Sequence, residues 1–566
     1  MQPLDAPFDA VLAMPGSKSH ANRALIAAVL ASGRSELRHA TPCDDVVHMV
    51  RGLQQLGFRL AWRDRAAGVV AVDGGIPRQP GASGTIDCGA AGTVFRFLTA
   101  VACVVPGVWH LTGADRLGER PIDGLVEALR GLGADISAGG SEALLRIRGG
   151  ALRSGRVRLD GTASSQFATA LQLIEPVLPG PLEIEWIGPR ASPEYLDLTR
   201  LTRADFGAED AGGGYQPRPD YAIEGDWSAF GAFLVLAELT GSRVVATNLR
   251  ADSLQPDRRM PDVIADLRAT GDLEIDVHAV PDQLMNLAVL AARRSGTTRF
   301  VGAANLRGKE CDRLGVLVRE LRKVGIDLES HDDGVVVRGG GEALRPARLD
   351  PEADHRMVMA FAVLASLQSG IEINDVGCVA KSYPDFLVDL KRLRRQSRCV
   401  ALVGMRGSGK TTLGKALAER QGWSFVDTDA EIERRFGAIA DMVDGAAGWA
   451  GFRAREAEVA GEALRASRRV VALGGGAIET DAVRNELARS ATVIFVDTDE
   501  ATLRARIAGS GRPSITGRDL VDEVAVVAAG RRPHYEGLAA VTVDGTTSIP
   551  EATADMVRGL KSLCRW

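Results

Sequence analysis

The stretch GMRGSGKT, from Gly404 to Thr411, decides the fold of the C-terminal part of this chain. The apolar run CVALV (399–403) precedes it, and the helix-forming stretch TTLGKALAERQG (411–422) follows it. A strand, a glycine-rich loop ending in Lys-Thr and a helix form the setting in which this pattern binds nucleotide phosphates. The glycines let backbone N–H groups turn toward phosphate oxygens, Lys410 can reach the β- and γ-phosphates, and Thr411 can bind Mg²⁺. The flanking strand and helix argue against a chance glycine-rich turn.

The same pattern names the residues that should hold ATP. They belong to the loop and the first turn of the helix: Gly404, Met405, Arg406, Gly407, Ser408, Gly409, Lys410, Thr411 and Thr412. Because the loop begins only after residue 403, the nucleotide site accounts for the last third of the chain. The preceding residues require a separate explanation.

Composition permits several domains. The 566 residues are 45% apolar and 25% charged, and this length suits about three or four domains. The net charge of −5, from 68 basic and 73 acidic residues, excludes a global positive field that would attract nucleic acid or an anionic membrane. The basic run KRLRRQSR (391–398) fits a solvated helix end and linker better than a binding tail.

Cysteine usage and the first residues bear on the compartment. The seven cysteines form no CxxC pair and no metal-like cluster, which is typical of thiols in a reducing compartment. The opening MQPLDAPFDA lacks the layout of a signal peptide, and no uncharged apolar run reaches membrane-spanning length. We therefore expect a soluble cytoplasmic protein.

A weak repeat runs through the first 390 residues, in which helix-like segments end at a glycine and continue into a strand-like run. The copies are LQQLGFRL (53–60), LRGLGADI (129–136), LRATGDLEI (267–275), LRKVGIDLE (321–329) and the looser LTRADFGAED (201–210). In each, the glycine can adopt the left-handed conformation that ends a helix. The pattern predicts an αβ unit used about six times, with a crossing between two halves near GGGYQPRPDY (212–221). Unrelated αβ units that share this cap are the alternative.

Scattered clusters of one chemical character carry the chemistry of this region. They combine cations, hydroxyls and glycine-rich turns, which suit small ligands rich in phosphate and carboxylate. The clusters are PGSKSHANR (15–23), DCGAAGTVFRF (87–97), RLGERPI (116–122), TASSQF (162–167), VPDQ (280–283), NLRGKECDR (305–313), ADHRM (353–357) and VAKSYPDF (379–386). Taken singly, each is explained as well by a capped helix or a surface ion pair.

In this order and spacing, the clusters together resemble the 5-enolpyruvylshikimate-3-phosphate (EPSP) synthase family over residues 1–393. The resemblance implies an α/β fold of two subdomains, each with three copies of a βαβαββ unit around buried helices, as an inside-out α/β barrel. Subdomain I would take residues 1–14 and 222–393, and subdomain II residues 15–221. The implied reaction transfers the enolpyruvyl group of phosphoenolpyruvate to shikimate 3-phosphate and needs no cofactor.

The resemblance also assigns substrate contacts. For shikimate 3-phosphate they are Lys18, Ser19, Arg23, Ser164, Ser165, Gln166, Ser192, Tyr195, Asp282 and Lys309. For phosphoenolpyruvate they are Lys18, Gly92, Arg120, Gln166, Arg313, Arg356 and Lys381. We expect Asp282 to be the base near the attacking hydroxyl, and Glu310, with Lys18, to protonate the methylene of phosphoenolpyruvate.

Two positions depart from the family pattern. Ala90 stands where many members carry asparagine, and Phe97 where some carry proline. Both flank Gly92, beside which the inhibitor glyphosate would lie in this resemblance. The departures bear on inhibitor sensitivity and phosphoenolpyruvate affinity, and they leave the expected reaction unchanged.

Residues 398–566 resemble the shikimate kinase family, which implies a three-layer α/β/α domain with a parallel sheet. Asp427 would bind Mg²⁺ together with Thr411, and Asp429 would hold and help to deprotonate a shikimate hydroxyl. Arg512, in GSGRPSITG (509–517), would close over the ATP phosphates as part of a lid. The shikimate contacts would be Asp429, Arg453, Gly474, Gly475, Gly476 and Arg531, with Glu456 orienting Arg453.

The two resemblances support each other, because the kinase would make the shikimate 3-phosphate that the synthase consumes. The expected small-molecule partners are shikimate, ATP, shikimate 3-phosphate and phosphoenolpyruvate, with Mg²⁺ serving the kinase, no nucleic acid or membrane partner, and a monomer favoured. One alternative is an enolpyruvyl transferase for a UDP-amino sugar, whose mobile-loop cysteine has no counterpart in GADRLGERP (113–121). Another is a nucleotide-binding module without turnover, against which the presence of Asp429 and Arg453 argues.

Overall fold

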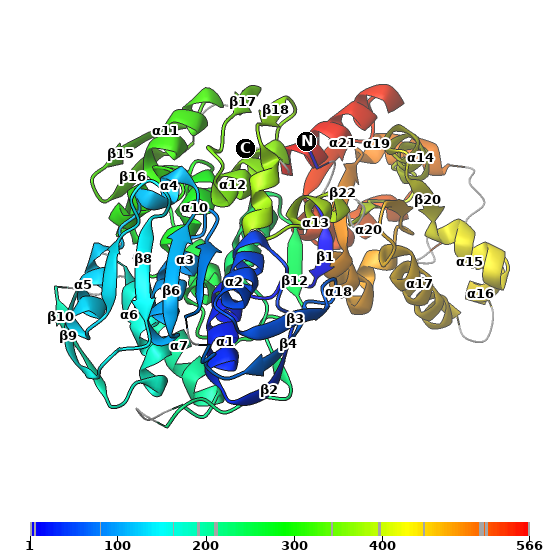
Figure 1. Cartoon of the computed structure of the whole chain (residues 1–566). Coiled ribbons are helices and arrows are strands. Elements are labelled where there is room, and N and C mark those ends of the chain that lie inside the picture. The colour runs from blue at the N-terminus through cyan, green and yellow to red at the C-terminus, as the bar shows by residue number, and fades with distance from the viewer. Residues whose placement is uncertain are drawn as a thin grey trace. The chain divides into compact units, whose positions relative to one another are not determined.

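A computed structural model describes residues 3–4, 7–79, 81–161, 164–188, 193–208, 213–340, 343–393, 398–444, 448–508, 514 and 519–563. The chain forms two compact units (Figure 1). The first consists mainly of Val11–Glu238 and Val245–Val388. The second combines Leu4–Ala10 and Leu239–Val244 with the chain from Asp389 onward. No helix among the described residues has both the length and the apolar character needed to cross a membrane.

Three four-stranded sheets organise the larger part of the chain. The strand order of the first sheet is β11 (Tyr221–Ala222), β2 (Gly33–Arg38), β4 (Val69–Gly74) and β3 (Arg59–Asp64). That of the second is β5 (Ser83–Asp87), β6 (Gly107–Thr112), β8 (Leu145–Gly149) and β7 (Asp135–Ala138). That of the third is β13 (Leu273–Asp276), β14 (Thr297–Val301), β16 (Gly334–Arg338) and β15 (Asp327–His331). Three two-stranded sheets pair β1 (Asp9–Leu12) with β12 (Arg243–Ala246), β9 (Gly155–Asp160) with β10 (Leu182–Ile187), and β17 (Ala347–Leu349) with β18 (Ile371–Ile373). The described residues before β19 thus form six small sheets.

Helices connect these strands and fill the space between the sheets. They are α1 (Lys18–Leu30), α2 (Asp44–Gln55), α3 (Gly92–Val104), α4 (Asp115–Gly118), α5 (Asp123–Gly131), α6 (Ser165–Ile174), α7 (Glu194–Asp205), α8 (Trp227–Leu239), α9 (Met260–Asp266), α10 (Leu284–Ala291), α11 (Arg313–Lys323), α12 (His355–Ala365) and α13 (Phe386–Leu393). Every residue of α10 and α12 is buried, and α1 is buried from His20 to Leu30. Such all-round burial identifies core helices.

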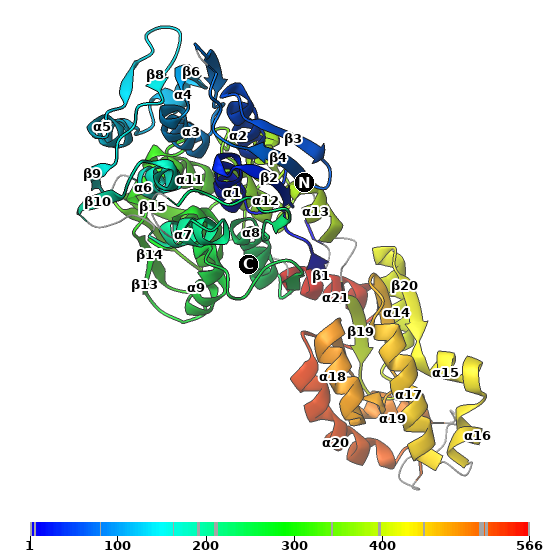
Figure 2. The same ribbon diagram turned by 60° about the horizontal axis from the view of Figure 1, so that its bottom comes forward.

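The predicted repeat corresponds to a βαβαββ unit. Two units are continuous in the chain: β5, α3, β6, α5, β7, β8 and β13, α10, β14, α11, β15, β16. In the first, β5 and β6 are parallel because α3 carries the chain across, and β8 then pairs antiparallel with both β6 and β7. Figures 1 and 2 show α3 beside β6 and β8.

The remaining copies depart from the expected unit. β2, β3 and β4 are joined by β11, which comes from much later in the chain. The other three sheets lack the terminal hairpin among the described residues. Among the described residues, a complete set of four strands is thus found in the three four-stranded sheets.

The glycines of the repeat adopt the predicted conformation. Gly57, Gly133, Gly271 and Gly325 have φ values of +92°, +93°, +84° and +91°. Gly207, in the looser copy, has a φ of +67°. Since side chains with a Cβ rarely adopt this conformation, the glycines end the helical segments and turn the chain toward the next strand or loop.

The second unit contains a five-stranded parallel sheet. Its spatial order is β20 (Ser424–Asp427), β21 (Arg469–Ala472), β19 (Cys399–Val403), β22 (Ala491–Asp497) and β23 (Val541–Asp544). Its helices are α14 (Lys410–Gln421), α15 (Thr428–Phe436), α16 (Ile439–Asp444), α17 (Gly448–Leu464), α18 (Asp481–Ser490), α19 (Glu500–Ile507), α20 (Glu523–Leu538) and α21 (Ile549–Leu563). Figure 2 shows β19 among these helices.

Alternate residues of β19 enter two cores. Cys399, Ala401 and Val403 belong to a core that includes residues of α17 and α18. Val400 and Leu402 belong to another, which includes residues of α14 and α21. Because successive side chains of a strand point to opposite faces, this division gives the predicted three-layer α/β/α arrangement.

Candidate active sites

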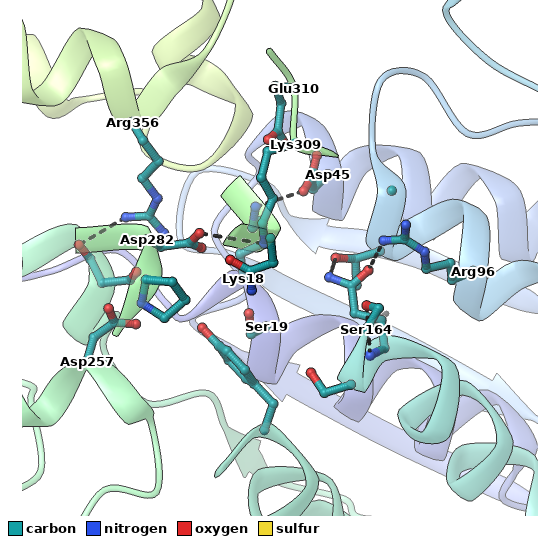
Figure 3. Close-up of a pocket in the computed structure, with 18 of the residues that line it drawn as sticks. Lys18, Ser19, Asp45, Arg96, Ser164, Asp257, Asp282, Lys309, Glu310 and Arg356 are labelled. Carbon is teal, nitrogen blue, oxygen red and sulfur yellow. Dashed lines mark hydrogen bonds and ion pairs between the residues drawn. The ribbon is translucent and has the colours of Figure 1, made fainter. Parts of the chain in front are cut away.

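The first unit contains a cavity of about 440 Å³ to which five helix N-termini contribute residues. The residues are Lys18 of α1, Gly92 of α3, Ser165 of α6, Arg313 of α11 and His355 of α12. Each helix N-terminus carries a partial positive charge and unpaired backbone N–H groups. Their convergence, seen in part in Figure 3, makes the cavity suitable for anions.

Arg313 organises the acidic side of this cavity. Its Nη1 donates to Oδ1 of Asp282 at 2.7 Å, and its Nη2 donates to Oε2 of Glu310 at 3.0 Å. Its Nε donates to Oδ2 of Asp354, the fully buried carboxylate that caps α12. One buried guanidinium thus fixes the positions of three carboxylates.

The cations keep both predicted acid–base residues ionised. Burial alone would raise the pKa of Asp282, but the charges of Lys309 and Arg313 outweigh it and hold the pKa below its ordinary value. Burial likewise opposes the charge on Glu310, whose pKa is nevertheless held well below its ordinary value by Lys381, Arg313 and Arg120. Lys381 Nζ lies 2.9 Å from Oε1 of Glu310. Both residues are therefore carboxylates at neutral pH in this structure.

Two arginines offer donors that are buried and unsatisfied. Among the described residues, Nε and Nη1 of Arg120 and Nε of Arg356 have no hydrogen-bond acceptor. Nη1 of Arg120 lies 3.6 Å from Oε1 of Glu310, beyond hydrogen-bond distance. Since buried donors without acceptors destabilise a fold, such nitrogens in a cavity indicate a site for an anionic ligand.

Gln166 links two neighbouring groups on the opposite side of the cavity. Its Oε1 accepts from Nη1 of Arg96 at 2.5 Å, and its Nε2 donates to Oγ1 of Thr93 at 3.0 Å. Burial lowers the pKa of Arg96 to about 9. Ser164 caps α6 by accepting from the backbone N–H of Gln166, so the two serines 164 and 165 lie at a helix N-terminus.

Arg23 also lines the cavity, but its nitrogens bond to the protein. Its Nη1 donates to the Ser19 carbonyl at 2.7 Å, and its Nε donates to Oγ1 of Thr199 at 2.9 Å. Its Nη2 donates to the Tyr195 carbonyl at 3.2 Å. Burial lowers the pKa of Arg23 to about 10. Arg23 therefore positions Ser19 and Tyr195, which both line the cavity.

The structure brings nearly all the predicted residues of the first site together. Those lining the cavity are Lys18, Ser19, Arg23, Gly92, Arg120, Ser164, Ser165, Gln166, Tyr195, Asp282, Lys309, Glu310, Arg313 and Arg356. Lys381 is not among the residues lining it, although its ammonium reaches Glu310 and, at 2.7 Å, the Ala90 carbonyl. Ser192 lies outside the described residues.

Sequence reasoning missed several acids of the cavity. Asp45 forms an ion pair with Lys18, with 2.9 Å between Oδ2 and Nζ. Asp226 and Asp257 also line the cavity, and burial raises the pKa of Asp257 to about 6. Asp45 lies in the first turn of α2, where acidic residues are common because the helix N-terminus is partly positive. No local signal separates these acids from capping residues.

A second cavity, of about 480 Å³, lies over the glycine-rich loop of the second unit. Predicted residues that line it are Arg406, Gly407, Gly409, Lys410, Thr411, Thr412, Asp427, Asp429 and Gly475. Gly404, Gly407 and Gly409 have φ values of +149°, +82° and +100°, so the loop requires glycine at all three positions. Sequence reasoning missed Arg506, Gly545 and Thr547, which also line this cavity.

The loop positions Lys410 and Thr411. Nζ of Lys410 donates to the carbonyls of Gly404 and Met405, at 3.0 and 2.9 Å. Oγ1 of Thr411 donates to Oδ2 of Asp427 at 2.5 Å. Gly404, Met405 and Ser408 are not among the residues lining the cavity. Arg512 of the predicted lid lies outside the described residues.

Arg453 and Arg531 form a group with two glutamates. Nη1 of Arg453 donates to Oε2 of Glu456 at 2.5 Å, and Nη2 donates to Oε2 of Glu479 at 2.8 Å. Nε of Arg531 donates to the other oxygen of Glu479, also at 2.8 Å. Glu479, at the end of η7 (Ala477–Glu479), was not predicted from the sequence.

The glycines of LGGGA make room for these side chains. A Cβ at Gly474 would lie 2.5 Å from oxygens of both Asp429 and Glu456, and one at Gly476 would overlap the guanidinium of Arg453. The carbonyl of Gly475 accepts from the Tyr535 hydroxyl at 2.5 Å. This loop therefore joins Asp429 to the arginine pair.

Comparison with known proteins identifies the larger part of the chain. Residues 5–390 match the family model described as EPSP synthase (3-phosphoshikimate 1-carboxyvinyltransferase). The chain belongs to the EPSP synthase family. A 3-phosphoshikimate 1-carboxyvinyltransferase of Methanoculleus marisnigri is 36% identical over 410 residues, which cover 67% of this chain and 96% of the relative.

The region that follows the EPSP synthase part matches a second family. Residues 406–560 match the model described as shikimate kinase. The pentafunctional AROM polypeptide of Schizosaccharomyces japonicus is 32% identical over 557 residues. That alignment covers 85% of this chain and 35% of the polypeptide. The chain is therefore an EPSP synthase followed by a shikimate kinase, a bifunctional enzyme of the shikimate pathway.

A solved structure supports the fold of the EPSP synthase part. The EPSP synthase of Acinetobacter baumannii aligns with a TM-score of 0.58 at 22% identity, covering 69% of this chain and 97% of that chain. At this identity the likeness concerns the fold alone. It agrees with the βαβαββ units found here.

Proposed function

We propose that the synthase cavity binds shikimate 3-phosphate and phosphoenolpyruvate together and transfers the enolpyruvyl group between them. One observation carries this proposal: five helix N-termini and the unsatisfied nitrogens of Arg120 and Arg356 surround two ionised acids, Asp282 and Glu310. Two ligands rich in phosphate and carboxylate would satisfy these donors. The acids would then serve as the proton-transfer groups.

Shikimate 3-phosphate would lie on the side of Ser164, Ser165 and Gln166, where the N-terminus of α6 favours a phosphate. Tyr195 and Ser19 would contact its ring, and Ser192 stays a predicted contact. Phosphoenolpyruvate would lie between Arg120, Arg313 and Arg356, with Gly92 against it. The remaining proposed contacts are Lys18, Arg23, Lys309 and Lys381.

Asp282 would take the proton of the attacking hydroxyl, for which its ionised state suits it. Glu310 must instead give a proton to the methylene carbon, yet its cationic neighbours hold it ionised. The phosphate and carboxylate of phosphoenolpyruvate would share Arg120, Arg313 and Lys381 with Glu310. Their negative charge would raise the pKa of Glu310, so ligand binding itself would prepare the proton donor. The resulting tetrahedral adduct would then lose phosphate by C–O cleavage and return one methyl proton to a base in the cavity, which restores the enol ether. The same cations would stabilise the departing phosphate.

In the second unit the kinase would transfer the γ-phosphoryl group of ATP to shikimate. Lys410, Thr412 and the loop N–H groups would hold the ATP phosphates, and Asp429 would orient the attacking hydroxyl. Arg453, Arg531 and the glycines 474–476 would bind the shikimate carboxylate. Arg512 stays a predicted contact of the phosphates.

Mg²⁺ fits the pair Thr411 and Asp427. Their oxygens lie 2.5 Å apart beside Lys410, and a hydroxyl with a carboxylate suits this ion, whose other ligands would be phosphates and waters. The ion would supply charge neutralisation for the phosphates. The acid and base roles proposed for the synthase cavity do not require Mg²⁺.

We further propose the synthase bounds 1–393, with subdomain I at 1–14 and 222–393 and subdomain II at 15–221, and kinase bounds of 398–566. The matched ranges 5–390 and 406–560 support the division between the two enzymes. A monomer and a cytoplasmic location stay predictions.

One assay tests both activities. The chain is given shikimate, ATP, Mg²⁺ and phosphoenolpyruvate, and ADP and inorganic phosphate are measured separately. We expect ADP to form first and phosphate to follow. Shikimate 3-phosphate together with phosphoenolpyruvate should support phosphate release without shikimate or ATP. Release of ADP without any phosphate from phosphoenolpyruvate would contradict the proposed pairing.

A further inference from the structure

Glu479 occupies the two guanidiniums that are proposed to bind the shikimate carboxylate. Its two oxygens take different arginines, Oε2 from Nη2 of Arg453 and Oε1 from Nε of Arg531, each at 2.8 Å. A carboxylate bridging two guanidiniums is also the arrangement proposed for the substrate. Glu479 thus makes, within the chain, the contacts expected of the ligand.

Each terminal nitrogen of Arg453 already donates to a carboxylate of the protein. Nη1 is held by Glu456 and Nη2 by Glu479. Glu456 lies one turn away on the same helix, with only 1% of its side chain exposed. Glu479 lies on a short 3₁₀ turn, with 43% of its side chain exposed. Glu479 is therefore the partner that can leave for water.

Arg531 has a donor ready for an additional acceptor. The residue is 2% exposed, and Nη2 has no hydrogen-bond acceptor among the described residues. The cavity above the loop reaches Asp429 and Gly475, whereas neither arginine is among the described residues that line it. In this structure both arginines are thus bound to Glu479 and do not line the cavity.

We propose that Glu479 is an internal carboxylate that competes with the shikimate carboxylate for Arg453 and Arg531 and sets the affinity for shikimate. The inference rests on the proposed role of this arginine pair. A bound ligand carboxylate would exchange with Glu479, whose side chain would turn into water.

Local charge supports the exchange. Two arginines face Glu456, Glu479 and Asp429 in this group, so the acids already exceed the cations by one. A further carboxylate beside Glu479 would add repulsion at short range. Moving Glu479 into solvent screens its charge and removes that repulsion.

The test measures shikimate affinity in the whole chain. In Glu479→Gln and Glu479→Ala we expect the Kd for shikimate, measured by calorimetry without ATP, and the KM to fall by about 5-fold or more, because the arginines lose a charged competitor. The KM for ATP and kcat should change little. An analogue with a hydroxymethyl group in place of the carboxylate should gain much less than shikimate from either variant.

Glu536→Gln is the matched control, since Glu536 binds Arg532, the neighbour of Arg531 on α20. It should leave the Kd for shikimate unchanged. An unchanged or higher Kd in both Glu479 variants would overturn the inference and make Glu479 inert or a positioning residue for the arginines. Arg453→Ala and Arg531→Ala test the proposed function separately from the role of Glu479. If neither variant changed the Kd for shikimate, the proposed function of this arginine pair would itself be contradicted.

Discussion

The Thr411 hydroxyl donates to the Asp427 carboxylate, with 2.5 Å between Oγ1 and Oδ2. Asp427 also accepts from the backbone N–H groups of Asp429 and Ala430, which makes it the cap of α15. One carboxylate therefore links the glycine-rich loop to the helix that carries Asp429. A cation bound there would be placed relative to both ATP and shikimate.

Removing divalent metal should stop one reaction alone. With EDTA in excess, we expect ADP formation to cease, because the phosphates lose their counter-charge, while phosphate release from phosphoenolpyruvate continues. Asp427→Asn should raise the Mg²⁺ concentration for half-maximal kinase activity by about 10-fold. Kinase turnover that persists in EDTA would contradict the proposed metal site.

Lys410→Ala should silence the kinase and spare the synthase. Lys410 donates to the carbonyls of Gly404 and Met405, and charge-assisted bonds of this kind contribute about 1.5–3 kcal/mol each. The variant loses these bonds and the cation for the β- and γ-phosphates. Supplied shikimate 3-phosphate should still be converted at the wild-type rate. Loss of both activities in a folded variant would refute two independent sites.

Asp282→Asn and Glu310→Gln should each reduce synthase kcat by about 10²-fold or more, since both changes keep shape and remove proton transfer. The KM for phosphoenolpyruvate should change less than kcat. Each variant also leaves Arg313 with one charged partner fewer, so the thermal unfolding midpoint is measured alongside. Near-wild-type turnover in both variants would show that other residues serve as the acid and the base.

Gly92→Ala should alter the phosphoenolpyruvate side of the cavity. A Cβ at Gly92 would lie 2.6–2.8 Å from the guanidinium atoms of Arg120. Overpacking of this kind costs about 1–3 kcal/mol unless the arginine shifts. We expect a modest rise in the KM for phosphoenolpyruvate and a much larger rise in the inhibition constant of glyphosate. The placement of Gly92 fails if neither constant changes, with kinase activity as the folding control.

His20 should make the synthase part sensitive to acid. Its ring nitrogen Nε2 lies 2.7 Å from the Tyr221 hydroxyl, and burial, with Arg23, lowers its pKa from 6.5 to about 4. Between these values the unfolded chain binds more protons than the folded chain, so stability falls as pH falls. At pH 5 the loss amounts to about 2 kcal/mol.

In His20→Gln, whose amide can still donate to Tyr221, this loss should disappear. The readout is the thermal transition that shikimate 3-phosphate shifts upward, since the ligand marks unfolding of the synthase. Between pH 7.5 and 5 the wild type should lose a few degrees more than the variant. An identical pH dependence in the two proteins would show that His20 is not buried in its neutral form.

Sequence predicts this fold where one residue decides a local conformation. Gly57 and Gly133 must adopt positive φ after their helices, so each marks a helix end followed by a strand. The run Cys399 to Val403 became β19 with the same bounds, because a buried parallel strand must be apolar on both faces. Strand pairing was not predictable, since it depends on distant partners such as β11 for β2.

Site residues were predictable where they belong to a sequence motif. They were less predictable where packing of distant segments brings them into the site. Arg313 was expected to bind a ligand, but two of its three carboxylate partners, Asp282 and Asp354, come from other segments that only the fold brings near it. Asp257 acquires its raised pKa from burial, which no local pattern indicates. Glu479 follows the glycines 474–476 by a few positions, yet its contacts require α17 and α20 to meet that turn.

The pairing of β1 with β12 has a consequence for synthesis of the chain. Among the described residues, the core containing α1, α2, α3, α5 and α6 uses residues between Ala21 and Ile223, so it can close before β12 is available. β1 leaves the ribosome before this core but must wait for β12. In released chains truncated between α8 and β12, we expect the core helices α1, α2, α3, α5 and α6 to resist protease while β1 is still cleaved. A strand made before the core is thus among the later ones to find its partner.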